Sequence, residues 1–241
     1  MNTRTYEETF DNGPGGWLGW VAGYGVGGGV RKLEIVDGAA KAQPPWGIDF
    51  NHAPPGAAYL QLPYVLLTNN ERHYQEFSGP NRFVEEGYST NLTDTKFTVR
   101  IRGQMDMKGT EMLLLVQAGV PRDNPKLVAN MVLKAQPIAI TPDWSEQTLY
   151  LAPDPKQWLC MGTRGEGADC PIYGCAPIED VLRDVNDDII LVLFGLDIVP
   201  AVPIQGDIHR LRAGKDYPVD ESRLPSGFML LDTVRIEYPL T

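Results

Sequence analysis

Residues 96–118 read KFTVRIRGQMDMKGTEMLLLVQA and carry the clearest structural pattern in the chain. Apolar and polar side chains alternate at the start of this stretch, so that Phe97, Val99 and Ile101 share one face, as in a half-buried strand. Residues 111–118 form a nearly continuous apolar run, which is typical of a strand covered on both faces. The glycines and polar residues between the two patterns predict a turn. The stretch therefore predicts two successive β-strands.

Similar patterns recur along the rest of the chain, and turns rich in Gly and Pro separate them. Helical periodicity is scarce, and its best example is the short segment 178–185. Many strands, few helices and a total of 25 Gly and 20 Pro predict an all-β fold, a β-sandwich of antiparallel sheets. Neither a repeat nor a Pro/Ser-rich linker divides the chain, so we expect residues 1–241 to form a single β-sandwich domain. The further predicted strands are residues 127–133, 147–151, 188–194 and 228–238.

The composition limits the classes of partner. Hydrophobic residues make up 43% of the chain and charged residues 22%, which is ordinary for a globular protein with a sizeable core. A net charge of −10 argues against nucleic acid, whose binding requires clustered Lys and Arg. No apolar run reaches the roughly 18 residues of a transmembrane helix, so we expect no membrane partner. The first residues lack an apolar leader, which predicts a cytoplasmic protein or a secreted one whose leader was removed.

Residues 46–60, WGIDFNHAPPGAAYL, are the strongest candidate for a binding site. They gather aromatic and polar side chains around a Pro-Pro-Gly turn, and loops on a rigid scaffold are where binding groups concentrate. The aromatic rings would stack on the apolar faces of a sugar, and the polar side chains would hydrogen-bond its hydroxyls. The structural alternative is that Trp46 belongs to the core and that the polar residues cap turns. The predicted ligand-binding residues are Trp46, Asp49, Asn51, His52 and Tyr59.

Three short segments, two near the ends of the chain and one in its middle, form a recognisable series. Residues 7–17, EETFDNGPGGW, contain a Phe-Asp-Asn-Gly turn followed by Gly-Trp. Residues 97–103 are followed by the aromatic turn 143–144 and a short strand pattern. Residues 231–236, LDTVRI, place an Asp and a Thr within an apolar strand. Each motif is weakly specific alone, and their order along the chain gives them weight.

In this order the three segments resemble the carbohydrate-binding-module jelly roll, the galactose-binding-like β-sandwich. The resemblance implies a jelly roll that binds a carbohydrate or a similar small polar ligand. Such modules are usually shorter, so this chain would carry long loop insertions, near residues 40–95 and 153–225. Lectin-like and glycoside-hydrolase jelly rolls have a comparable size and stay open as alternatives.

The resemblance also implies a structural calcium ion between the first and last strands. The matching carboxylates in this sequence are Glu7 or Glu8 near the start and Asp232 near the end. Calcium prefers oxygen ligands, and here it would stabilise the fold rather than catalyse a reaction. The alternative is that Asp232 caps a strand end.

Two further functions stay open beside carbohydrate binding. A glycan-active hydrolase or lyase would use His52 with a nearby carboxylate such as Asp49 as acid and base, because a His titrates near neutral pH. A structural or oligomerising sandwich would instead use its aromatic loops as a subunit interface.

The three cysteines lie within one predicted loop, with the spacing C-x9-C-x4-C. This spacing matches no standard zinc pattern. Either a disulfide such as Cys170–Cys175 pins the loop, or the thiols are free and partly buried. An odd number of cysteines leaves at least one unpaired within the chain, which weakly favours a reducing compartment.

Overall fold

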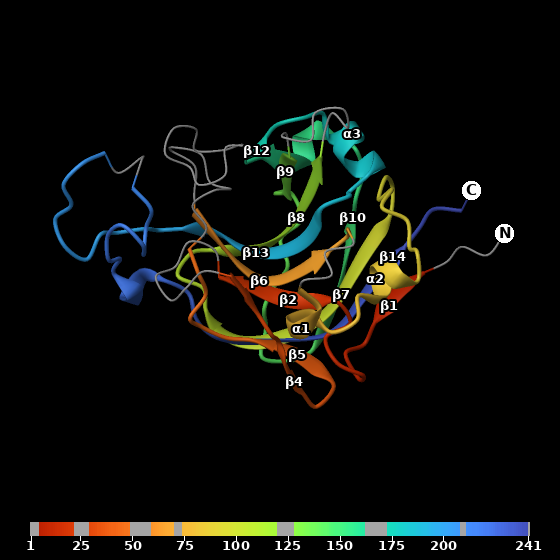
Figure 1. Ribbon diagram of the computed structural model, residues 1–241, viewed down its shortest axis with the longest axis horizontal. Coiled ribbons are helices and arrows are strands. Elements are labelled where there is room, and N and C mark those ends of the chain that lie inside the picture. The colour runs from red at the N-terminus through yellow and green to blue at the C-terminus, as the bar shows by residue number, and fades with distance from the viewer. Residues whose placement is uncertain are drawn as a thin grey trace.

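The computed structural model describes residues 5–21, 29–48, 59–69, 74–119, 128–161, 173–207 and 211–240. Within these ranges the chain forms two stacked β-sheets of six and eight strands (Figure 1). Every strand pair is antiparallel except β12 with β9. The predicted all-β sandwich of antiparallel sheets is therefore confirmed.

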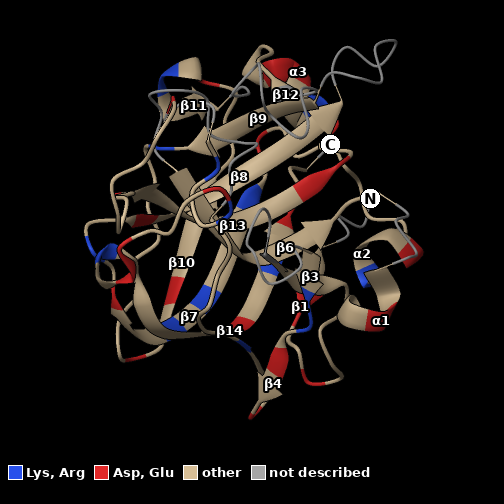
Figure 2. Ribbon diagram, turned by 60° about the vertical axis from the view of Figure 1, so that its left-hand side comes forward, with Lys and Arg blue, Asp and Glu red and all other residues tan. Residues whose placement is uncertain are grey.

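Sheet A has the strand order β10-β7-β14-β5-β4, and β1 pairs with β14 beside β5. Its strands are β1 (Tyr6–Glu8), β4 (Glu34–Val36), β5 (Ala39–Ala42), β7 (Lys96–Asp106), β10 (Ser145–Tyr150) and β14 (Ser226–Glu237). The opening and closing strands are thus neighbours, as the family resemblance implies. Figure 2 shows acidic and basic residues along β4, β7 and β14, whose outer face points away from sheet B.

Sheet B has the strand order β11-β9-β8-β13-β6-β2-β3, and β12 pairs with β9. Successive strands β6, β7 and β8 alternate between the two sheets, which is the connectivity of a jelly roll. The strands of sheet B are β2 (Trp17–Val21), β3 (Gly29–Arg31), β6 (Tyr59–Leu67), β8 (Glu111–Gly119), β9 (Val128–Leu133), β11 (Trp158–Cys160), β12 (Tyr173–Gly174) and β13 (Asp188–Leu196).

Helices are short and lie outside the sheets (Figure 1). In the described ranges none has the length and apolar character that a transmembrane span requires. The predicted helix at 178–185 is observed as α3 over six residues. The helices are α1 (Gln75–Ser78), α2 (Arg82–Glu85) and α3 (Ile178–Arg183), with 3-10 turns at Pro155–Gln157 and Glu221–Arg223.

The predicted strands are observed within a few residues of their expected bounds, whereas β6 was not predicted. This strand lies at the centre of sheet B between β13 and β2, but it contains Pro63, which lacks the N–H that a central strand donates. The pairing of β6 shifts register beside Pro63 on both sides, between Leu191 and Leu193 and between Leu18 and Trp20. These bulges accommodate the proline. The sequence of β6 contains no pattern that predicts them.

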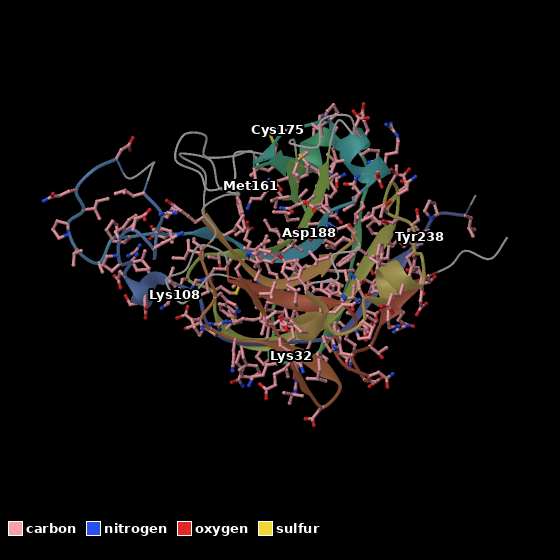
Figure 3. All side chains as sticks on the ribbon, in the orientation of Figure 1. Lys32, Lys108, Met161, Cys175, Asp188 and Tyr238 are labelled. Carbon is pink, nitrogen blue, oxygen red and sulfur yellow. A yellow bond between two sulfur atoms is a disulfide. The ribbon has the colours of Figure 1, made fainter. Side chains whose placement is uncertain are left out.

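Side chains fill the space between the two sheets (Figure 3), and the buried apolar residues form three clusters. The largest fills the space between the sheets and includes Trp17, which is fully buried. A second lies on the opposite face of sheet B, because residues such as Leu115 and Ile190 alternate with residues of the first cluster along their strands. The third is built by the segment after β13 and includes Tyr217.

Candidate functional site

The structure separates the residues that the sequence grouped in one binding loop. Trp46 has only 6% of its surface exposed and belongs to the cluster between the sheets. Tyr59 begins β6 and packs against the other two clusters. The predicted residues Asp49, Asn51 and His52 lie outside the described residues. The two aromatic residues therefore do not form one stacking platform.

A groove of about 140 Å³ opens where the edges of the two sheets meet. One wall comes from β2 and β3 of sheet B, and the other comes from β4 and β5 of sheet A and the residues that follow β5. The chain passes from sheet B to sheet A at this edge, because β3 and β4 are separated by only two residues. The lining residues are Gly19, Trp20, Arg31, Lys32, Leu33, Glu34, Lys41, Ala42, Gln43, Pro44, Trp46 and Pro63.

The groove combines aromatic surface with groups that form hydrogen bonds. Trp20 is partly exposed, and its ring meets that of Tyr74 edge-on at 5.6 Å between centroids. Lys41 and Glu34 are cross-strand neighbours, and Lys41 Nζ lies 3.3 Å from Glu34 Oε2. Partial exposure leaves these side chains able to contact a ligand. Such a set of aromatic faces with a few placed polar groups is typical of small-ligand sites.

Trp46 shapes the floor of this groove mainly as a structural residue. Its carbonyl oxygen accepts a hydrogen bond from Gln61 Nε2 at 3.3 Å, and Gln61 is itself buried in β6. The sequence placed Trp46 among the ligand-binding residues; Trp46 lines this groove, and its role in binding stays a prediction. It gave no signal for the residues of β3 to β5, because these short strands show neither strong alternation nor an aromatic motif.

The carboxylate of Glu8, one of the predicted calcium ligands, is buried in a closed network. Its Oε1 accepts hydrogen bonds from the backbone N–H groups of Thr9 at 3.1 Å and Phe10 at 3.0 Å. Its Oε2 lies 3.3 Å from Arg82 Nη1. Gly15 has a φ of +58°, and a Cβ atom there would lie 1.8 Å from Glu8 Oε2, so only glycine fits.

The same network reaches the buried core. Tyr6, two residues before Glu8, accepts a hydrogen bond from Trp17 Nε1 at 3.0 Å through its hydroxyl oxygen. Burial raises the pKa of the Tyr6 hydroxyl well above its ordinary value, and the nearby Glu8 carboxylate raises it further. Glu8 thus links the first turn of the chain, the core and α2.

The three predicted calcium ligands do not converge. Glu8 points inward beside Tyr6, whereas Asp232 lies on the outer face of sheet A and pairs with Arg100 at 2.7 Å. The outward Glu7 faces Arg235, with 3.8 Å between Oε1 and Nη1. A register shift between Leu231 and Thr233 turns Asp232 outward, and each carboxylate already has an arginine partner. In the described ranges no three His, Cys, Asp or Glu residues are placed to hold a metal ion, so these residues do not fit a calcium site.

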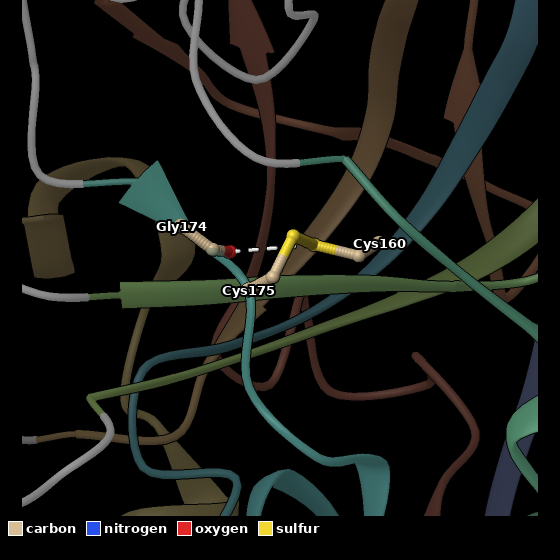
Figure 4. Close-up of a disulfide and its surroundings, with 3 residues drawn as sticks. All are labelled: Cys160, Gly174 and Cys175. Atoms are coloured by element: carbon tan, nitrogen blue, oxygen red, sulfur yellow. Dashed lines mark hydrogen bonds between the residues drawn. A yellow bond between two sulfur atoms is a disulfide. The ribbon is translucent and has the colours of Figure 1, made fainter.

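The disulfide joins Cys160 to Cys175, and the predicted Cys170–Cys175 pairing is wrong (Figure 4). Cys160 ends β11 and Cys175 follows β12, and both strands pair with β9. The sheet brings the two Cα atoms to 5.7 Å, a distance that a disulfide spans. Cys170 lies outside the described residues. Proximity in space, rather than in sequence, decides the pairing.

We expect removal of this disulfide by the double substitution Cys160→Ser/Cys175→Ser to lower the free energy of unfolding by about 3 kcal/mol, because the bond closes a loop of 15 residues. Urea unfolding under non-reducing conditions measures the loss. The matched control is Cys170→Ser, which leaves the Cys160–Cys175 bond in place and should change stability little. Equal losses from the control and the double variant would contradict this pairing.

Comparison with known proteins gives distant similarity to solved structures only. No protein-family model matches the sequence, and no curated protein matches it. The CBM22-1–GH10 modules of Clostridium thermocellum xylanase 10B, complexed with xylohexaose, are similar over 100% of this chain, which spans 29% of that chain (10% identity, TM-score 0.38). CtCBM11 is similar over 100% of this chain and 91% of its own (9% identity, TM-score 0.34). The L4b domain of human laminin alpha-2 is similar over 99% of this chain and 100% of its own (9% identity, TM-score 0.37). Likeness at this level carries no functional argument, and the jelly-roll β-sandwich rests on the strand pairing of this chain.

Proposed function

We propose that this protein binds a carbohydrate in the groove between the edges of its two sheets. The observation that supports the proposal is the partly exposed Trp20 beside the Lys41–Glu34 pair in one groove. An indole face contacts the C–H surface of a sugar ring, and charged side chains donate and accept hydrogen bonds with its hydroxyls. The resemblance of the three ordered segments to carbohydrate-binding modules points the same way.

Within the groove the residues have separable roles. Trp20 lines the groove and would supply contact area, because its ring is partly exposed and is positioned by an edge-on contact with Tyr74. Glu34 accepts and Lys41 donates hydrogen bonds, so the pair is suited to neighbouring hydroxyl groups. Arg31 and Gln43 add further donors at the rim. Ligand orientation would come from these polar groups and affinity from the tryptophan.

We expect Trp20→Ala to weaken glycan binding about tenfold or more, equivalent to the loss of about 1.4 kcal/mol of binding free energy. The assay is a glycan array followed by calorimetric titration of the retained oligosaccharide. Tyr150→Ala is the matched control, because Tyr150 is 57% exposed on β10, an edge strand of sheet A that does not line the groove. Equal loss in both variants, or binding that survives Trp20→Ala, would contradict the groove as the site.

The same variants test the other predicted functions. A role for Trp20 in an oligomer interface would shift the elution volume of Trp20→Ala toward the monomer without any glycan present. The hydrolase or lyase alternative depends on His52 and Asp49, which lie outside the described residues, and it stays a prediction. A reducing-end release assay on the retained glycan distinguishes turnover from binding.

A further inference from the structure

The groove between the sheet edges carries an excess of positive charge. Its charged lining residues are Arg31, Lys32, Glu34 and Lys41, three cations and one carboxylate. The whole chain has the opposite balance, with 21 basic residues against 31 acidic ones. The charge of the groove is therefore a local reversal of the charge of the protein, and it bears on which carbohydrate the groove would accept.

One of the three cations is neutralised within the groove. Lys41 Nζ lies 3.3 Å from Glu34 Oε2, in the cross-strand ion pair between β4 and β5. In the part of the chain that the structure describes, Arg31 and Lys32 have no acidic side chain as a partner. The guanidinium and the ammonium group are adjacent in the chain, and both keep their N–H donors for a ligand or for water.

The backbone beside Arg31 leaves room for a ligand. Arg31 ends β3 and is the cross-strand partner of Gly19 on β2. A Cβ atom at Gly19 would lie 3.7 Å from Arg31 Cβ and 3.4 Å from the carbonyl oxygen of Pro63, so a larger side chain there would take up space among the lining residues. Arg31 is partly exposed, and Lys32, labelled in Figure 3, is exposed. A ligand in the groove can therefore reach both side chains.

We propose that the groove selects an acidic carbohydrate, whose carboxylate or sulfate group binds to Arg31 and Lys32. This inference rests on the proposed carbohydrate-binding function. A guanidinium group donates two parallel hydrogen bonds to two oxygens of such an anion, and an ammonium group adds a compact positive charge. The Lys41–Glu34 pair remains for the neutral hydroxyl groups of the same sugar.

Selection by charge has to be local in this protein. The net charge of −10 repels anions at long range, but physiological salt screens this repulsion beyond about 8 Å. At contact distance the two unpaired cations of the groove dominate. An acidic sugar gains charge-assisted hydrogen bonds from them, which are about twice as strong as the neutral bonds that an uncharged sugar would form.

The test compares pairs of glycans that differ only in charge. Oligogalacturonic acid is compared with its methyl ester, and a carrageenan oligosaccharide with its desulfated form, by calorimetric titration of the wild-type protein. We expect an acidic form to bind about tenfold more tightly than its neutral form, roughly the value of one charge-assisted hydrogen bond. Raising the salt concentration from about 0.02 M to about 0.2 M should weaken only the acidic form. A preference within either pair supports the proposal, and the pair that shows it distinguishes carboxylate from sulfate.

Two double variants assign the preference to the groove. Arg31→Gln/Lys32→Gln keeps hydrogen-bond donors but removes both charges, so it should abolish the preference and leave binding of the neutral form nearly unchanged. Lys96→Gln/Lys156→Gln is the matched control, because it gives the same net charge by removing two exposed lysines that do not line the groove. The control should keep the preference. Equal loss of the preference in both double variants would overturn the assignment to the groove.

The outcomes separate this inference from the proposed function. Equal affinity of the wild type for the acidic and neutral forms would overturn the inference and leave a site for neutral carbohydrate. Inorganic sulfate that binds as tightly as the sulfated oligosaccharide would overturn it as well, since the sugar would then contribute nothing. A protein that retains no glycan, acidic or neutral, would overturn the proposed function and this inference together. If the groove variant does not fold, the wild-type comparison and its salt dependence decide.

Discussion

Trp46→Ala is expected to lower the free energy of unfolding by about 3–5 kcal/mol, the usual cost of truncating a buried tryptophan. The indole is 6% exposed and packs in the cluster between the sheets, so its removal leaves a cavity that the surrounding strands fill only in part. Urea unfolding followed by circular dichroism measures the loss. The sequence alone predicts a different outcome, namely loss of ligand binding in a stable protein.

Trp20→Ala is the matched control for Trp46→Ala, because both tryptophans line the same groove and only Trp46 is buried. The Trp20 variant should lose binding and keep most of its stability, and the Trp46 variant should lose stability first. If the Trp46 variant has the same urea midpoint of unfolding as the wild type, the indole ring of Trp46 does not stabilise the core.

Glu8→Ala is expected to lower the free energy of unfolding by about 1–3 kcal/mol, the cost of leaving buried hydrogen-bond donors without their acceptor. The change removes the acceptor for the N–H groups of Thr9 and Phe10, whereas Arg82, which is 41% exposed, keeps its ion pair with Glu86. Phe10 is fully buried with a φ of +61°, which a residue other than glycine adopts only where its surroundings hold it. We expect the turn after β1 to loosen first, visible as faster amide exchange of Thr9 and Phe10.

The neighbouring Glu7→Ala serves as the control, since Glu7 is exposed and lies 3.8 Å from Arg235. It should change stability by no more than about 0.5 kcal/mol. Because Arg82 already neutralises Glu8, EDTA should leave the Tm of the wild type unchanged. A drop in Tm with EDTA that Glu8→Ala abolishes would show instead that Glu8 holds a metal ion.

The sequence by itself determined the fold class, because strand periodicity is a local property. Polar and apolar side chains alternate over residues 96–103 but not over residues 111–118. This difference correctly predicts that one sheet has an exposed outer face, whereas the other sheet is buried on both faces. The central strand β6 escaped prediction because Pro63 interrupts its pattern, and the compensating bulges depend on the pairing with β2 and β13.

Only the tertiary structure decided which side chains meet. It buried Trp46 between the sheets, joined Cys160 to Cys175 across β9, and turned Asp232 away from Glu8 at a bulge. It also brought Arg31, Lys32 and Lys41 to one groove. Such contacts depend on the register between strands that are distant in the chain, and a shift of one residue would reverse the face on which every side chain lies.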